Sequence, residues 1–255
     1  MDWHRRYLQQ AAWTRGLREY LFARAGLPEA RRVLEVGSGT GAVLADVTVP
    51  RVGLPPDRVV RQPVFFGLDI DRASLSQCQS NAPTARLIQA NALTLPFPAR
   101  TFDIVFCHFF LLWVGDPLSA LRELRRTAIS GGHILALAEP DFTQRVDAPE
   151  DLAEAGSLQT ESLRRQGADV AMGSRMAQLF EQAGLRLIEA GLIQPTLQVR
   201  SDRAEGEMEW HVLEADLGAV ASTALIDRFR QLDSVARRSG LRRTYVPTFF
   251  AWGQV

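Results

Sequence analysis

Residues 33–41, with the sequence VLEVGSGTG, decide the fold of this chain. An apolar strand carries an acid near its end, Glu35, and runs into three alternating glycines. Glycine lets the backbone turn tightly and approach a ligand with no Cβ in the way. A second apolar segment, GLDID at 67–71, places Asp69 at a strand end, where an acid can accept hydrogen bonds from a ribose. Two carboxylates around a glycine loop favour a nucleoside ligand that carries a positive charge.

Composition and charge predict a globular protein with one domain. The 255 residues are 46% hydrophobic, which is enough for a full core, and α/β folds of this length are often a single domain. The formal net charge is zero, so no overall field attracts nucleic acid or an anionic membrane. All 29 Lys and Arg residues are Arg. The absence of Lys excludes Schiff-base and P-loop lysine chemistry.

The cysteines, the histidines and the N-terminus set expectations for location and metals. The two cysteines, Cys78 and Cys107, form no CxxC, which predicts a reduced, cytoplasmic protein without structural zinc. No histidine pair has ligand spacing, so we expect no metal site. The N-terminus lacks the apolar stretch of a signal peptide, and no apolar run is long enough to cross a membrane. Short arginine pairs without interleaved aromatics predict no nucleic-acid partner.

Strand-like and helix-like segments alternate from residue 32 to residue 138. The expected strands are 32–36, 64–68, 85–89, 102–107 and 133–138. The expected helices between them are 40–47, 73–80 and 117–128. This alternation predicts a parallel sheet with helices on both faces. The proline-rich stretch 49–63 is too long and stiff for a simple connection, and we expect it to be a surface excursion.

The order of these motifs resembles that of class I S-adenosylmethionine (SAM)-dependent methyltransferases, nearest the branch of ubiquinone/menaquinone C-methyltransferases. The resemblance covers residues 30–140 and rests on motifs at 33–41, 67–71, 91–98 and 102–105. It implies a Rossmann-like, mostly parallel sheet and SAM as the cofactor. The implied reaction is methyl transfer to O, N, S or activated C of a small, largely apolar acceptor.

The resemblance also implies a cofactor site. Its expected members are Glu35, Gly37, Ser38, Gly39, Thr40, Gly41, Asp69, Ile70, Asn91, Ala92, Cys107 and His108. Glu35 would hold the methionine ammonium through water, and Asp69 would bind both ribose hydroxyls. Ile70 would pack on the adenine. Asn91 stands where the family usually has Asp, and its carbonyl can still accept from the adenine amine.

The resemblance over residues 30–140 and the pattern of the remaining residues together predict one domain with several functional segments. Residues 1–28 would be a helical lid, 29–141 the SAM-binding core, 142–245 the substrate-side helices and a strand, and 246–255 a final strand. Helices are expected at 2–26, 152–166, 174–183 and 204–239, and a terminal antiparallel hairpin at 185–199 and 246–253. Helices within 145–183 and 204–239 would cover the carboxyl edge of the sheet, where ligands of open α/β sheets bind, and enclose the substrate with largely apolar side chains.

Several assignments stay open at this level. His108, with an ordinary pKa near ~6.5, is either a general base or a residue that only lines the pocket. Glu139 and Asp141 are expected in a solvated turn, although both could reach the substrate. The aromatics near the N-terminus form a lid or the core face of a docked helix. The N-terminal arginines form a solvated face, or one of them meets the cofactor carboxylate.

Two other functions compete with methyl transfer. Residues 37–42 also satisfy the G-x-G-x-x-G/A pattern of an NAD(P)-dependent oxidoreductase. Against it, Glu35 would face a pyrophosphate poorly and an ammonium well, and the chain has no Tyr-x-x-x-Lys pair. The third possibility is a non-catalytic protein that binds SAM or S-adenosylhomocysteine. The partners expected are a small-molecule acceptor and, at most, a second copy of the chain.

Overall fold

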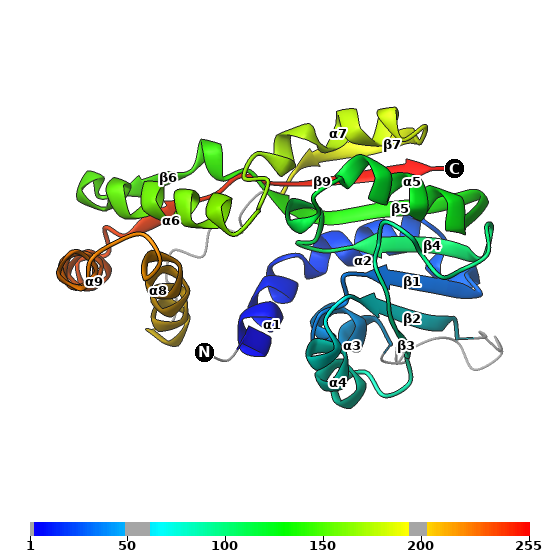
Figure 1. The fold of residues 1–255 in the computed structure, drawn as a ribbon, viewed down its shortest axis with the longest axis horizontal. Helices are drawn as coiled ribbons and strands as arrows, with labels where there is room; N and C mark the ends of the chain where they lie inside the picture. Colours follow the sequence, from blue (N-terminus) through cyan, green and yellow to red (C-terminus); the bar gives the residue numbers. More distant parts are fainter. Residues whose placement is uncertain (1–2, 49–61, 194–202) are drawn as a thin grey trace.

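A twisted seven-stranded sheet forms the centre of the computed structural model, which describes residues 3–48, 62–193 and 203–255 (Figure 1). The strands run in the order β3-β2-β1-β4-β5-β9-β7. Their bounds are β1 Arg32–Val36, β2 Val64–Asp69, β3 Arg86–Gln89, β4 Phe102–Cys107, β5 Ala128–Pro140, β7 Arg186–Leu192 and β9 Thr248–Gln254. The predicted surface excursion lies almost wholly outside the described residues.

The first five strands are parallel, and the last two complete the sheet differently. β9 lies between β5 and β7 and is antiparallel to both. This confirms the predicted mostly parallel sheet with an antiparallel strand pair. The strand expected at 133–138 is longer in the structure. β5 begins at Ala128, which pairs with Phe102, and the strand continues through Gly131 and Gly132.

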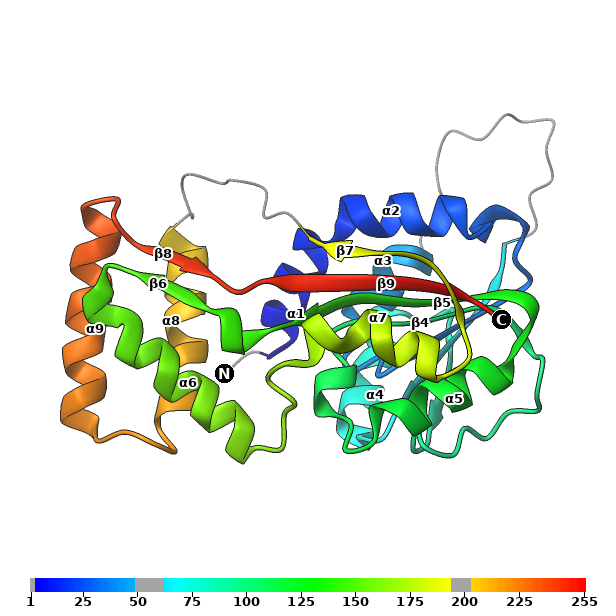
Figure 2. The same cartoon turned by 90° about the horizontal axis from the view of Figure 1, so that it is seen from above.

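Helices cover both faces of the sheet, and Figure 2 shows α2 and α7 on opposite sides. One face carries α2 Arg15–Arg24, α3 Ala42–Thr48 and α4 Arg72–Asn81. The other carries α5 Pro117–Thr127 and α7 Met172–Gln182. The prediction for α7 was wrong, because α7 packs against the sheet face rather than over the carboxyl edge.

α7 packs against the sheet face because one side of this helix is apolar. Met176, Leu179 and Phe180 are buried in the same cluster as Leu121 and Leu124 of α5. Apolar side chains at this spacing form one stripe of a helix, and the sheet face offers the larger apolar surface. We call the sheet with the helices on its two faces the sheet core.

A helical lobe extends from the carboxyl edge of the sheet core (Figure 1). Its helices are α6 Ala153–Arg165, α8 Arg203–Leu217 and α9 Thr223–Arg238. They surround an apolar cluster that includes Trp210, Leu217 and Phe229. A two-stranded antiparallel sheet, β6 Val146–Ala148 with β8 Arg243–Tyr245, joins the lobe to β5 and β9. The sequence did not predict this small sheet.

The N-terminal segment lies between the two parts. The helix expected at 2–26 is broken at Thr14 into α1 Trp3–Trp13 and α2. His4 of α1 forms a hydrogen bond between its Nδ1 and the Oγ1 of Thr40, 2.8 Å away, which attaches α1 to the glycine loop. Within the described ranges, no helix has both the length and the apolar character to cross a bilayer.

Candidate functional site

A cavity of about 1600 Å³ lies at the carboxyl edge of the sheet, bounded by the sheet core, α1 and the helical lobe. Nine of the predicted site residues line it. They are Glu35, Gly37, Ser38, Gly39, Asp69, Ile70, Asn91, Ala92 and His108. Ligand pockets usually measure roughly 300–1,000 Å³, so this cavity has room for a nucleoside cofactor together with a second molecule.

The glycine loop forms the floor of the cavity beside β1. Gly37 has φ +75°, and a Cβ there would lie 2.2 Å from Cδ2 of Phe110, so both its conformation and its neighbour require glycine. Gly39 has φ +48° and no close neighbour on its Cβ side except Tyr7 at 4.0 Å. The backbone at Gly39 is therefore open to a ligand.

Glu35 is the buried acid of the site. The residue is 2% exposed, and its Oε2 has no hydrogen-bond partner among the described residues. Burial raises the pKa of the carboxyl well above its usual value, while the nearby Arg18 guanidinium acts in the opposite direction. A buried carboxylate oxygen without a donor is costly, and an ammonium group would satisfy it. The residues present therefore fit a cationic ligand at the end of β1.

Asp69 is held in place by two backbone groups. Its Oδ2 accepts from the N–H of Gly39 at 2.7 Å, and its Oδ1 accepts from the N–H of Asp71 at 2.9 Å. A carboxylate has about four acceptor positions, so two remain for hydroxyls of a ligand. The fixed orientation and the remaining capacity suit the predicted ribose contact.

Ile70 and Asn91 line the part of the cavity beside Asp69, which, together with the glycine loop, we call the cofactor half. Ile70 is 67% exposed, which leaves a branched apolar side chain at the cavity. The Oδ1 of Asn91 accepts from the N–H of Leu93 at 2.9 Å, and one acceptor position of that oxygen remains. Both placements agree with a flat, hydrogen-bonding ring in this part of the cavity.

Three predicted site residues do not line the cavity. Cys107 is 0% exposed in the core, and burial raises the pKa of its thiol well above the usual value. Gly41 packs against Cys78, whose Sγ would be 2.7 Å from a Cβ. Thr40 is buried and bonded to His4. Thr40 and Gly41 support the glycine loop from outside the cavity, and Cys107 belongs to the apolar core at the end of β4.

His108 lines the cavity, but its ionisation differs from the expectation. Its Nε2 lies 2.9 Å from Oγ1 of Thr14, the residue between α1 and α2. Burial, with a further contribution from the positive charge of Arg18, lowers the pKa of the ring to about 3. The value near ~6.5 assumed from the free side chain is therefore wrong here. The ring is neutral at physiological pH.

Glu139 and Asp141 do not lie in a solvated turn, so that expectation was also wrong. Glu139 is 0% exposed and accepts from the backbone N–H groups of residues 110, 111 and 112 at 2.9, 2.8 and 3.1 Å. Burial raises the pKa of Glu139 to about 7, against the effect of these hydrogen bonds. Asp141 is 1% exposed and accepts from the N–H of Thr143. Both carboxylates hold the backbone around the cavity.

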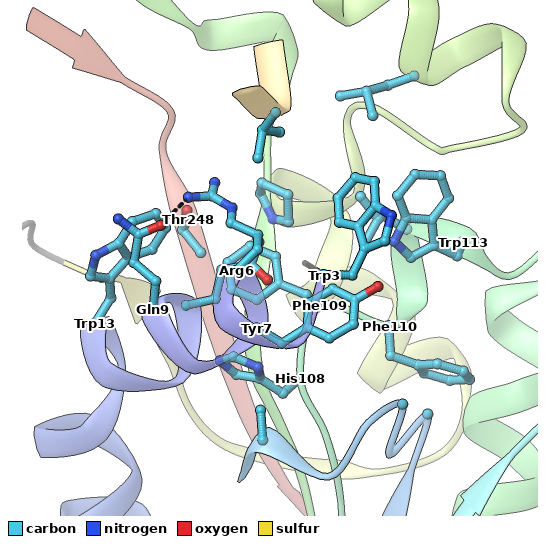
Figure 3. A pocket seen from close by; sticks show the side chains of 18 of the residues that line it. Trp3, Arg6, Tyr7, Gln9, Trp13, His108, Phe109, Phe110, Trp113 and Thr248 are labelled. Carbon is cyan, nitrogen blue, oxygen red and sulfur yellow. Dashed lines mark hydrogen bonds between the residues drawn. The ribbon is translucent and has the colours of Figure 1, made fainter. Parts of the chain in front are cut away.

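Aromatic side chains surround the middle of the cavity (Figure 3). Trp3 and Tyr7 of α1 have ring centroids 6.3 Å apart, and Trp113 lines the cavity beyond the end of β4. Phe109 adopts φ 50°, which is rare for a non-glycine residue and occurs mostly where a site requires it. The aromatic residues that follow His108 in the sequence indicated this part of the cavity, but the predicted site did not include them.

A network of buried and partly buried charges lies along the wall of the cavity in the helical lobe, and we call it the polar network. Its members are Glu209, Arg237, Asp233, Arg242, Asp147 and Arg145. Successive members are joined by ion pairs of 2.6–3.1 Å between charged atoms. A Cβ on Gly156 of α6 would be 2.1 Å from Asp147 Oδ2, so glycine lets the helix approach the network. The expected apolar lining of this region is wrong for this wall.

Comparisons with known proteins agree with this geometry. The family model described as "Methyltransferase domain" matches residues 34–136. A malonyl-[acyl-carrier protein] O-methyltransferase of Halorhodospira halophila is 28% identical over 176 residues, covering 67% of this chain and 51% of the relative. The ubiquinone/menaquinone biosynthesis C-methyltransferase UbiE of Idiomarina loihiensis is 30% identical over 131 residues, covering 51% and 50%. The chain thus spans about half the length of the curated relatives it matches.

A solved structure supports the fold across most of the chain. A Bacillus halodurans C-125 protein assigned to the methyltransferases superposes with a TM-score of 0.58 at 16% identity, covering 92% of this chain and 97% of that one. At this identity the likeness shows the fold. The family model spans the glycine loop, Asp69 and β4, so this part of the chain is similar to methyltransferase domains.

Proposed function

We propose that this protein transfers the methyl group of SAM to an O, N, S or activated C atom of a small acceptor bound between α1 and the helical lobe. The observation that carries the proposal is the buried Oε2 of Glu35, which has no hydrogen-bond partner in the described part of the chain, in the same cavity as Asp69. An ammonium and a pair of ribose hydroxyls are the groups that these two carboxylates suit. SAM carries both.

Each part of the cofactor has a candidate partner. Glu35 would hold the methionine ammonium, with Gly37 and Gly39 allowing the backbone close to the ligand. Asp69 would accept from the ribose hydroxyls. Ile70 and Asn91 would contact the adenine by packing and by hydrogen bonding. The backbone of Ser38 and of Ala92 completes the predicted set that lines the cavity.

The chemistry requires little from the protein beyond alignment. In an in-line displacement the acceptor atom forms a bond to the methyl carbon while the carbon–sulfur bond breaks, and sulfur keeps the electron pair. Positioning and exclusion of water account for most of the acceleration in such reactions. The neutral His108 ring, beside Thr14, is suited to positioning the acceptor, because a pKa of about 3 makes it a weak base at neutral pH.

Cofactor binding tests the proposal directly. We expect S-adenosylhomocysteine to bind the purified protein, and Asp69→Ala to weaken binding by roughly 10- to 100-fold, because hydrogen bonds to a charged group are lost. Isothermal titration measures both, with NADH titrated in parallel. The matched control is Asp116→Ala, which removes a carboxylate at the start of α5 that does not line the cavity. Heat from NADH without heat from S-adenosylhomocysteine would overturn the proposal in favour of an oxidoreductase.

A further inference from the structure

Two opposite charges line the cavity without an ion-pair partner. Arg6 of α1 donates to Oε1 of Gln9 at 2.7 Å, and its guanidinium carbon lies 4.8 Å from the centre of the Trp13 ring (Figure 3). Asp216 of α8 is 7% exposed and accepts from the side-chain amides of Gln159 at 2.6 Å and Gln166 at 3.4 Å. Within the described residues, neither charge has an opposite charge within 4.0 Å.

Most other charges on this wall are paired with one another, and the exposed Arg243 donates to backbone carbonyls instead. The polar network contains three arginines and three carboxylates, all joined by ion pairs. Arg6 on α1 and Asp216 on α8 both line the cavity outside this network. Burial lowers the pKa of Arg6, while Glu209 and Asp216 raise it. The two residues are near enough to interact electrostatically but do not touch.

Charges that are withdrawn from water and left apart are costly. A ligand that enters between them can satisfy both at once. A guanidinium binds a carboxylate well, because its N–H groups match the two oxygens. A carboxylate such as Asp216 only accepts, so it requires a hydroxyl or an ammonium. Arg6 and Asp216 together therefore suit a ligand that carries an anionic group next to a hydrogen-bond donor.

The position of Arg6 on α1 separates it from the cofactor half. The next residue, Tyr7, lies near Gly39, and the charges of Asp69 and Asp71 raise its pKa after the larger effect of burial. The charges that act on Arg6 come from α8 instead. One turn of α1 therefore presents Tyr7 to the glycine loop and Arg6 to the helical lobe.

We propose that the methyl acceptor has an aromatic or apolar body and a polar end that carries a carboxylate next to a hydroxyl or ammonium group, with Arg6 binding the carboxylate and Asp216 binding the donor. This rests on the proposed function, because the cofactor would occupy the glycine-loop half. Amino acids and hydroxy acids with an aromatic side chain have this chemistry. The rings around the middle of the cavity would hold the body.

Three probes of one shape test the proposal. L-Phenylalanine carries both polar groups, 3-phenylpropanoate lacks the ammonium, and 2-phenylethylamine lacks the carboxylate. We expect the protein saturated with S-adenosylhomocysteine to bind phenylalanine about tenfold more tightly than either of the others in isothermal titration. Arg6→Gln should reduce phenylalanine binding to the level of the amine, and Arg6→Lys should restore part of it. Asp216→Asn should reduce it to the level of 3-phenylpropanoate.

Controls separate this proposal from its competitors. Arg15→Gln removes an exposed arginine of α2 and should bind all three probes as the parent does. Equal binding of the three probes by the parent, or a preference for phenylalanine that survives Arg6→Gln, would overturn the proposal. It would also be overturned if Arg6→Gln weakened S-adenosylhomocysteine but not 5′-methylthioadenosine, since Arg6 would then bind the cofactor carboxylate. Failure of the parent to bind S-adenosylhomocysteine would instead count against the methyltransferase proposal itself.

Discussion

The sheet core and the helical lobe use different interactions for their interiors. Two large apolar clusters, one on each face of the sheet, fill the sheet core. The helical lobe has a smaller apolar cluster and, beside it, the polar network with side chains as little as 2% exposed. Buried ion pairs add little net stability compared with apolar packing. Their presence beside the cavity indicates that this wall is shaped for a ligand.

The sheet core and the helical lobe also differ in which ligand-binding residues can be substituted without destabilising the fold. In the sheet core, the residues proposed to contact the cofactor lie at or after strand ends, and of the nine that line the cavity only Ala92 belongs to an apolar cluster. In the helical lobe, Arg242 lines the cavity and also pairs with Asp147 of β6 and Asp233 of α9. Ligand recognition and stability are therefore separable in the sheet core and linked in the lobe. Three experiments test this contrast.

The largest effect is expected from Asp147→Ala, which leaves Arg145 and Arg242 without their shared partner. Removing one member of a buried ion pair costs about 3–5 kcal/mol, because an uncompensated charge stays buried. Denaturant unfolding measures the loss. The control is Glu161→Ala, which removes exposed ion pairs on α6 and should cost less than about 1 kcal/mol. Equal costs for the two variants would show that the polar network does not hold the lobe together.

A smaller effect is expected from Glu139→Gln in the sheet core, and it depends on pH. The pKa of Glu139 is raised to about 7 in the folded state, so its contribution to stability is complete below the unfolded pKa and is lost as pH rises through the folded value. Between about pH 5 and about pH 8, the parent should lose roughly 2 kcal/mol relative to the variant. Denaturant unfolding at each pH tests the prediction. Parallel pH profiles for the two proteins would contradict it.

The smallest effect is expected from His108→Gln. A ring with a pKa of about 3 does not change its charge near neutral pH, and Gln can keep a hydrogen bond to Thr14. The affinity for S-adenosylhomocysteine should change less than about threefold and follow the parent at every point from about pH 5 to about pH 8. A pH dependence that the parent shows and the variant lacks would mean that His108 titrates in this range and can serve as a general base.

The sequence predicted the sheet core well because its signals are local. Apolar strands alternate with helices, and glycines and acids at strand ends give both the topology and the residues around the cofactor half. The same reasoning placed Glu35 and Asp69 at one cavity because parallel strands end at a common edge.

The helical lobe was predicted less well because its features depend on distant contacts. β6 and β8 have three residues each, too few for a periodic signal, and they pair across almost 100 residues of sequence. The ion pairs of Asp147 form only when α9 and β8 come together. The low pKa of His108 likewise results from burial and from Arg18, which no local pattern reveals.

The position of β9 has a consequence for how the protein is made. Residues 248–254 hydrogen-bond with β5 on one side and β7 on the other, so they occupy an interior place in the sheet. A ribosome delivers β5 and β7 long before this strand emerges. Until it does, two strand edges that lack their partner are exposed, and such edges readily pair with other chains. The nascent chain is therefore most prone to aggregation after β7 has emerged and before β9 follows, and a chaperone that covers β5 and β7 would protect it in that interval.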